Sequence, residues 1–379
     1  MIYLDNSSTT KQADSVTKLM AEIAEERWGN PSSLHALGIR AEKHLETARK
    51  NVAALLGASQ DQVFFTSGGT EGDVMILTGV MRARKRERRK LIVSAVEHPA
   101  VLETAAALER DGFEVVRIGV DRMCRIDMDA LKDAIDEDTA LVSVMAVNNE
   151  TGTIMPVREI ANAAHAKGAY FHTDAVQALG KEDLKATGAD LITVSSHKIH
   201  GPMGVGGVFV GKGVKILPLI PGGGQEKGMR SGTENVPGIA GFGEAARLAA
   251  ENFEGHRRHF KEIHERLRDN IESSIRDIVV NSPDDGTHAV LNVSFMGTRG
   301  EVLLHTLEQE GIYVSTGSAC SSNKKGQSHV LTAMGLSGKE IEGAIRFSLS
   351  RYNTLEEMDM AADAVRRAVT RFRKLGSFR

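Results

Sequence analysis

Short apolar runs alternate with longer amphipathic segments through the first half of the chain. The runs are rich in Val, Ile, Leu and Phe and lie at 63–66, 91–96, 114–118, 140–147, 170–173, 191–195 and 205–211. Helical patterns lie between them, near 70–85, 99–111, 128–135 and 157–167. Buried strands linked by helices are typical of an α/β fold with a mainly parallel sheet covered on both faces. Such a sheet binds ligands at the C-terminal ends of its strands.

The pattern changes after the last of these runs. Residues 236–275 are almost wholly helical, and an Asn-Ser-Pro-Asp-Asp-Gly turn follows at 281–286. The remaining part has strand-like runs at 289–296, 313–316 and 344–349 and helical patterns near 300–310 and 355–374. A chain of 379 residues suggests two domains. We therefore expect a large domain over 15–255, a small α+β domain over 256–379, and residues 1–14 packed against the small domain.

Charge and hydropathy exclude several classes of partner. The chain has 47 Lys and Arg against 50 Asp and Glu, which gives no overall electrostatic reason to expect nucleic acid or an anionic membrane. The one basic tract, at 82–90, fits a solvated helix end and loop. No apolar run reaches the length of a membrane span, and the start MIYLDNSSTT lacks the features of a signal peptide. We expect a cytoplasmic protein with a small-molecule substrate.

A glycine-rich loop leaves one predicted strand and opens a helix. It reads Thr-Ser-Gly-Gly-Thr-Glu at 66–71. Glycines allow a ligand to approach the backbone, and unpaired N–H groups at a helix start favour an anion. The spacing matches neither a dinucleotide motif nor a P-loop. Taken alone, the loop fits a simple turn better than a ligand site. Together with the residues described next, it predicts a phosphate site that includes Gly69 and Thr70.

Two later strands end in residues that suit pyridoxal 5'-phosphate. Asp174 and Gln177 follow one strand, and Ser195, His197 and Lys198 follow the next. An enzyme of this kind needs a lysine for the Schiff base, an acid opposite the pyridinium nitrogen and donors for the phosphate. Taken singly, Asp174 and Lys198 favour a structural ion pair. Together with the glycine loop, they favour the cofactor.

Two further strand ends carry candidate residues. His98 follows the 91–96 run, where an imidazole can stack on a cofactor ring or move protons. Asn149 follows the 140–147 run, where its amide can donate to the cofactor's phenolic oxygen; a turn is the alternative.

The chain has two cysteines, which cannot form a disulfide framework and cannot alone supply a zinc site. No metal site is predicted. Cys320 stands in a small, polar stretch that reads as an exposed loop, with Lys324 and Lys325 nearby to favour the thiolate. Without the rest of the chain, an incidental thiol is the better interpretation. Cys124 is interpreted as incidental.

Motifs from nearly end to end resemble one family. They are YLDNSSTT at 3–10, GNPSSLH at 29–35, FTSGGTEGD at 65–73, EHPAV at 97–101, NNETGT at 148–153, HTDAVQ at 172–177, SSHKIHGPMGVG at 195–206, GGGQEKGMRSGTEN at 222–235, STGSACSS at 315–322 and IRFSLSRYNT at 345–354. In this order and spacing the chain resembles the cysteine desulfurases of the NifS/IscS type, in the class V aminotransferase group. The resemblance implies a three-layer α/β/α large domain of the aspartate aminotransferase type and a smaller α+β C-terminal domain.

The resemblance also implies roles for individual residues. Lys198 would form the Schiff base, His98 would stack on the ring, Asp174 would pair with its nitrogen, and Gln177 and Asn149 would meet the phenolic oxygen. The phosphate would be held by Gly69, Thr70, Ser195, His197 and, from the other subunit of a homodimer, Thr233.

The implied reaction converts L-cysteine to L-alanine. Arg346 would bind the substrate carboxylate with Asn30 close by, and Cys320 would take the sulfur as a persulfide. An acceptor such as a scaffold protein of the IscU type would receive it, for iron-sulfur cluster assembly or tRNA thiolation; whether Cys320 transiently ligates a cluster stays open. The segment NKKGQSHVL at 323–331 departs from the usual ASLEPSHVL, which affects loop mobility and partner choice. Two alternatives are another transaminase or lyase on this fold and a catalytically silent scaffold-binding subunit.

Overall fold

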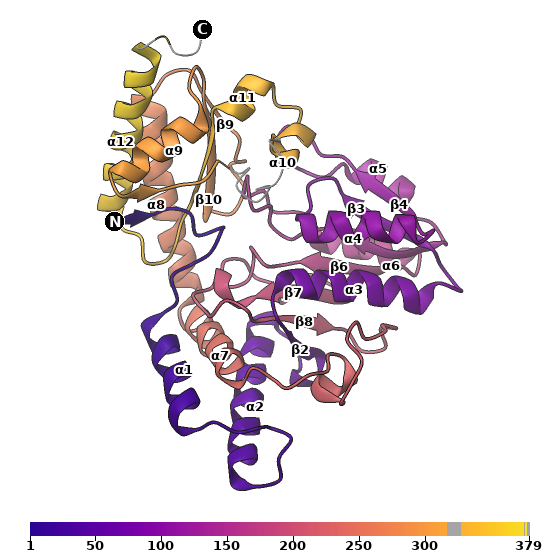
Figure 1. Cartoon of the computed structure of the whole chain (residues 1–379). Helices are drawn as coiled ribbons and strands as arrows, with labels where there is room; N and C mark the ends of the chain where they lie inside the picture. Colours follow the sequence, from indigo (N-terminus) through magenta and orange to yellow (C-terminus); the bar gives the residue numbers. More distant parts are fainter. Residues whose placement is uncertain (317–326, 375, 377–379) are drawn as a thin grey trace.

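The computed structural model describes residues 1–316, 327–374 and 376 (Figure 1). A seven-stranded sheet forms the centre of the larger part, in the order β2-β8-β7-β6-β5-β3-β4. Its strands are β2 (Val63–Thr66), β3 (Lys90–Ser94), β4 (Glu114–Ile118), β5 (Thr139–Ser143), β6 (Tyr170–Asp174), β7 (Leu191–Ser195) and β8 (Gly206–Val210). Neighbouring strands are parallel except β8, which runs antiparallel to both β2 and β7. The prediction of a mainly parallel sheet is confirmed.

Helices cover both faces of this sheet (Figure 1). The bounds are α1 (Asp14–Glu26), α2 (Ala36–Leu56), α3 (Gly69–Arg84), α4 (Pro99–Arg110), α5 (Met128–Ala134), α6 (Val157–Ala166) and α7 (Val236–Glu251). Successive side chains of a strand point to opposite faces. In β2, Phe65 therefore packs in one core with α1, α2 and α7, while Phe64 packs in another with α3 and α4. This three-layer arrangement confirms the predicted fold class.

A second, smaller sheet organises the C-terminal part. Its order is β12-β10-β9, with antiparallel neighbours, and it shares a core with α8, α9 and α12. The elements are α8 (Phe253–Ser274), β9 (Ile278–Val280), β10 (Val290–Phe295), α9 (Gly300–Gln309), β11 (Ile312–Tyr313), α10 (His329–Ala333), α11 (Gly338–Glu342), β12 (Ala344–Ser348) and α12 (Leu355–Lys374). The boundaries proposed at 14 and 255 stay a prediction.

The start of the chain lies beside this C-terminal part (Figure 1). Strand β1 (Ile2–Tyr3) pairs in parallel with β11. Ile2 and Leu4 join the core of the second sheet. The next residues then cross to the larger part, where the Thr10 amide donates to the carbonyl of His197 at 3.0 Å. The first ten residues therefore connect the two parts at the point where Lys198 lies.

Several strand predictions were too long, two of them by three residues or more. The run at 140–147 is a strand only to Ser143, although its later amides still follow β6: Val144 donates to the carbonyl of His172 and Ala146 to that of Asp174. The run at 313–316 contributes only Tyr313 to β11, and Ser315 instead bridges to Arg346. In both places the chain stays buried beyond the point where the regular ladder ends.

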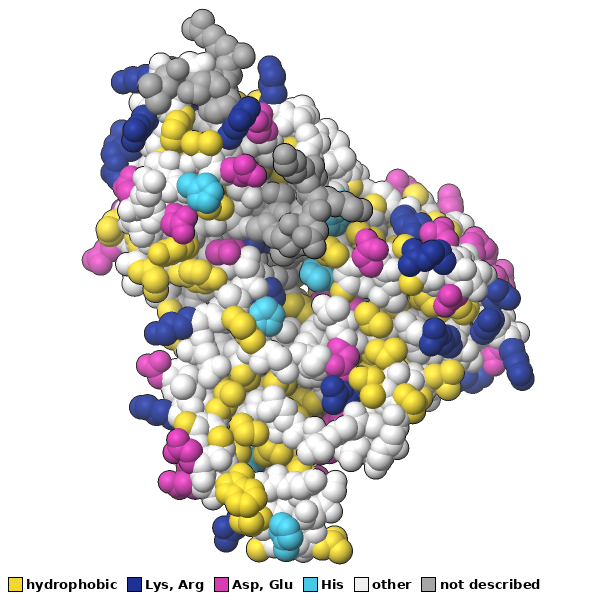
Figure 2. All heavy atoms as spheres, viewed as in Figure 1, with side chains coloured by type: hydrophobic (Ala, Val, Ile, Leu, Met, Phe, Trp, Pro, Cys, Tyr) yellow, Lys and Arg dark blue, Asp and Glu magenta, His cyan; other side chains and the backbone are white. Residues whose placement is uncertain are grey.

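The basic tract at 82–90 is only partly a solvated helix end. Arg84 is buried and donates to the carbonyls of Ala140 at 3.1 Å and Gly168 at 3.2 Å. Arg88 donates to the carbonyl of Thr139 at 3.0 Å. Figure 2 shows basic and acidic side chains interspersed on the face in view. Within the described ranges, none of the helices combines the length and the apolar character that crossing a bilayer requires.

Candidate active site

A cavity of about 250 Å³ lies where β6 and β7 end and α3 begins. It is lined by most of the residues predicted from the sequence. These are Gly69, Thr70, His98, Asn149, Asp174, Gln177, Ser195, His197, Lys198 and Arg346. The structure therefore brings together in one place residues that span most of the chain.

One end of the cavity is formed by the first turn of α3. The first N–H groups of a helix have no partner within it, so Gly69 and Thr70 present donors suited to an anion. Gly206 of β8 permits this arrangement, because a Cβ atom there would lie 2.7 Å from the Cα of Gly68. Ser195 and His197 line the same end. Burial, together with the charge of Lys198, lowers the pKa of His197 to about 4, so its imidazole is neutral at pH 7.

Asp174 lies at the end of β6 and is buried. Its Oδ1 accepts a hydrogen bond from the amide of Val176 at 2.8 Å, which fixes the carboxyl relative to the turn. Burial raises the pKa of Asp174, although the charges of His98 and Lys198 and the Val176 amide oppose the shift. A cation opposite this carboxyl would therefore be strongly favoured.

His98 occupies the N-cap position of α4. Its Nδ1 accepts a hydrogen bond from the amide of Ala100 at 3.1 Å, and Pro99 begins the helix. Burial lowers the pKa of His98. In the neutral ring the proton is thus on Nε2, since an amide N–H only donates.

Lys198 ends the short 3-10 turn Ser196–Lys198 that follows β7. Its Nζ donates to the carbonyl oxygen of Ser8 at 2.7 Å and also to that of Ser7. Gln177 donates to the same Ser7 carbonyl at 2.9 Å. The N-terminal segment therefore holds the side chains of both Lys198 and Gln177.

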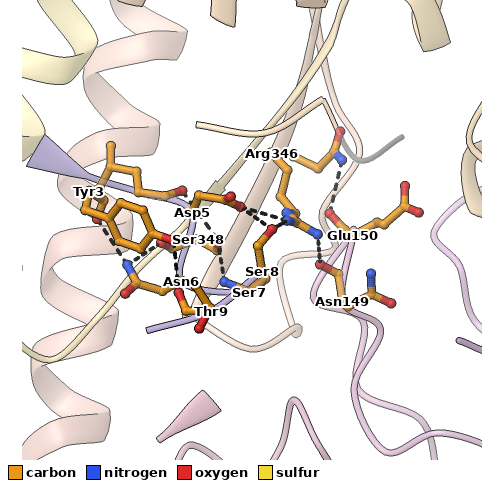
Figure 3. Close-up of polar contacts among 12 residues, drawn as sticks. Tyr3, Asp5, Asn6, Ser7, Ser8, Thr9, Asn149, Glu150, Arg346 and Ser348 are labelled. Atoms are coloured by element: carbon orange, nitrogen blue, oxygen red, sulfur yellow. Dashed lines mark hydrogen bonds and ion pairs between the residues drawn. The ribbon is translucent and has the colours of Figure 1, made fainter. Parts of the chain in front are cut away.

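Arg346 reaches the cavity from β12 of the C-terminal part (Figure 3). Its Nη2 donates to Oδ1 of Asp5 and to Oγ of Ser8, both at 2.9 Å, and its Nη1 donates to the carbonyl of Asn149 at 3.0 Å. Its Nε is buried with no hydrogen-bond partner in the described part of the chain. The guanidinium is thus fixed in place with donor capacity left for an anion.

Three predicted residues are not part of this cavity. Thr233 and Asn30 are exposed, and the Oδ1 of Asn30 accepts a hydrogen bond from the amide of Ser32 at 3.0 Å. Cys320 lies outside the described residues. The roles of all three stay predictions. Cys124 is fully buried, and burial raises the pKa of its thiol to about 12, which agrees with an incidental thiol.

Sequence reasoning did not assign roles to other lining residues, among them Ser7, Ser8 and Asp73. Each lies in a motif that carried the resemblance, at 3–10 or 65–73. Ser7 accepts through its backbone carbonyl, which leaves no signature in residue type. Ser8 accepts through both its carbonyl and its hydroxyl. Asp73 lies inside a helix, where a charged residue is ordinarily interpreted as solvated.

A family model described as aminotransferase class-V matches residues 2–360. The chain belongs to the class V aminotransferase family. "Cysteine desulfurase IscS" of Methanosarcina thermophila is 42% identical over 376 residues, which cover 99% of this chain and 93% of that protein. "Cysteine desulfurase" of Nostoc sp. is 42% identical over 384 residues, covering 100% and 95%. A solved structure titled "NIFS-LIKE PROTEIN" aligns with a TM-score of 0.91 at 39% identity, covering 97% of this chain and 99% of that one. The predicted resemblance is confirmed.

Proposed function

We propose that this chain is a cysteine desulfurase that depends on pyridoxal 5'-phosphate and releases L-alanine from L-cysteine. The observation that carries the proposal is the single cavity in which Lys198, Asp174, His98 and Arg346 meet. Curated relatives named cysteine desulfurase, at 42% identity over nearly the whole chain, support the same activity.

The donor set of the cavity fits pyridoxal 5'-phosphate. The α3 N-terminus with Ser195 and His197 suits its phosphate, and the buried Asp174 carboxyl suits its ring nitrogen. Gln177 and Asn149 would face its phenolic oxygen, and His98 would lie on its ring. When bound, the cofactor supplies an electron sink for negative charge on the substrate Cα. Thr233 would complete the phosphate site from a second subunit, which makes a homodimer the proposed assembly.

Arg346 would bind the substrate carboxylate. A guanidinium with three of its donors already fixed loses little freedom when a carboxylate binds to the rest. Asn30 is proposed to lie close to this carboxylate. The substrate would thereby be oriented with its amine toward Lys198.

Two residues are candidates for the base that removes the Cα proton. The Nδ1 of His98 already accepts a backbone hydrogen bond, and its Nε2 carries the ring proton. His98 is thus arranged to donate at Nε2. The Lys198 amine, when neutral, would carry a lone pair that can accept this proton. We therefore assign the base to Lys198 and ring stacking and proton donation to His98.

Cys320 would take the sulfur. Its thiolate attacks the substrate sulfur, so the carbon–sulfur bond breaks and the sulfur–sulfur bond of a persulfide forms. The persulfide sulfur then passes to an acceptor protein, for which a scaffold protein of the IscU type is proposed. The assignment of Cys320 rests on the sequence motif STGSACSS.

The test measures alanine and sulfide released from L-cysteine, with cofactor absorbance as a second signal. Wild type is expected to form both products. Lys198→Ala should lose turnover and the borohydride-fixed adduct, whereas Cys320→Ser should keep the bound cofactor and lose the persulfide. Transfer of the substrate amine to the cofactor without sulfur release would indicate a transaminase. A protein that binds cofactor but gives no absorbance change with L-cysteine would indicate a silent subunit.

A further inference from the structure

A layer of buried polar side chains lies directly beneath the cavity, between α3 and the central sheet. We call Asp73, Ser143, His172 and Thr193 the polar layer; all four are at most 1% exposed. The Oγ of Ser143 is 2.8 Å from Nδ1 of His172, and Nε2 of His172 is 3.0 Å from Oγ1 of Thr193. Nε2 of His172 also lies 3.7 Å from Oδ1 of Asp73. The proposed reaction uses none of these four side chains.

Close packing of α3 on the sheet places Asp73 next to the other three residues of the polar layer. A Cβ atom at Gly72 would lie 2.7 Å from Cγ2 of Thr193, so only glycine allows α3 to approach β7 this closely. Thr193 is the register partner of Asp174 on the neighbouring strand. Asp73 and Asp174 therefore flank the same threonine from the helix and from the sheet, and both line the cavity.

The charge state of Asp73 follows from what surrounds it. The titratable groups that face it are Asp174 and His172 on β6 and Glu97 at the end of the β3–α4 connection. Burial lowers the pKa of His172 to about 3, so this ring supplies no positive charge at pH 7. Burial first, and then the charge of Asp174, raises the pKa of Asp73 well above its usual range, although a hydrogen bond with Thr193 opposes the shift.

The hydrogen-bond pattern agrees with a neutral side chain. Oδ1 of Asp73 is buried without a hydrogen-bond partner in the described part of the chain, where an ionised oxygen would demand several donors. Two ionised carboxyls flanking one threonine would repel each other strongly at low dielectric. One proton on the pair removes the repulsion, and Asp174 is the member that faces His98 and Lys198.

We propose that Asp73 is a positioning residue that stays protonated beneath Asp174 and so leaves Asp174 as the negative charge at this end of the cavity. A hydrogen bond joins its side chain to Thr193, the register partner of Asp174 on β7. The proposal rests on the proposed function in one respect only: the cofactor is what gives the negative charge of Asp174 its use.

The test compares the apoprotein of wild type and Asp73→Asn by thermal unfolding between about pH 4 and pH 8. Above about pH 4 the unfolded wild-type chain ionises Asp73 while the folded chain does not, so wild type loses stability relative to the variant as pH rises. The Tm of Asp73→Asn minus that of wild type should therefore increase by about 2 °C or more across this range. The exposed Asp133 on α5 provides the control, and Asp133→Asn should show a constant difference.

A difference that stays constant or falls with rising pH would overturn the proposal, because an ionised Asp73 stabilised by its surroundings gives that sign. Failure of Asp73→Asn to fold at pH 7 would overturn it as well, since an amide replaces a neutral carboxyl. As a second measurement, the infrared difference between the two holoproteins at pH 7 should contain the carbonyl band of a protonated carboxyl, and carboxylate bands in its place would contradict it. A chain that binds no cofactor would refute the proposed function yet leave the apoprotein comparison valid.

Discussion

Glu226 is a buried residue outside the active site whose replacement should be strongly destabilising. It lies in the segment 222–235, and it and Lys227 have φ angles of 47° and 56°, in the left-handed region that non-glycine residues seldom adopt. Its buried carboxylate accepts hydrogen bonds from Nη1 and Nη2 of Arg49 at 2.7 and 2.8 Å and from the amide of Phe65 at 2.8 Å. This carboxylate therefore anchors the segment that carries Thr233 to α2 and β2.

Glu226→Gln keeps the shape of the side chain and removes its charge. Breaking a buried pair from one side costs about 3 to 5 kcal/mol, and the lower end applies because the Arg49 side chain is 16% exposed. For a chain of this length the unfolding entropy is about 0.8 kcal/mol/K, so a loss of about 3 kcal/mol lowers Tm by about 4 °C. Calorimetry of the purified variant at pH 7 measures this shift.

The matched control is Glu251→Gln. Glu251 pairs with Arg247 at 3.1 Å, but the two side chains are 63% and 47% exposed. Exposed pairs contribute about 0 to 1 kcal/mol, so this variant should shift Tm by about 1 °C or less. If the two variants shift Tm equally, burial does not strengthen the Arg49–Glu226 pair and the reasoning fails.

The remaining predictions concern charge and burial elsewhere. Asp174→Asn keeps an acceptor for the Val176 amide but loses the carboxylate, so affinity for pyridoxal 5'-phosphate, measured by fluorescence titration, should fall about 100-fold or more; unchanged affinity would contradict the assignment. Burial lowers the pKa of His264 to about 4, so the unfolded chain binds a proton at this residue before the folded chain does, and the folded state loses stability as pH falls from about 6.5 to 4. In His264→Gln the Tm should therefore fall less over this pH range than in wild type. In Cys320→Ser, the buried Cys124 should react with a thiol reagent at pH 8 only after unfolding; rapid labelling of the native protein would show that it is accessible.

The sequence predicted most of the sheet well because most of its strands are buried on both faces. A strand covered by helices leaves a continuous apolar run, and 63–66 and 191–195 agree with β2 and β7 to the residue. The edge strand β4 agrees with 114–118 although it is only partly buried. Strand direction leaves no such mark. The antiparallel β8 therefore could not be distinguished from its parallel neighbours. The short β11 was predicted too long because the buried residues Val314 and Ser315 continue beyond its ladder.

Site residues were predictable where residue type carries the chemistry. Lys198, Asp174 and His98 stand at strand ends, where the fold class itself places a ligand. Asp5 was not predicted as a partner of Arg346, because 341 positions separate the two residues and their ion pair depends on tertiary packing. The exposed Thr233 and Asn30 belong to a site only if a second chain or a bound substrate completes it.

One serine contacts both ends of the proposed substrate-binding machinery. The hydroxyl of Ser8 accepts from Arg346, and its carbonyl accepts from Lys198. A small shift of this residue would therefore move both the Arg346 guanidinium and the Lys198 amine. Substitutions in the first ten residues are therefore expected to change KM and kcat together, so directed evolution of substrate scope would find this segment sensitive.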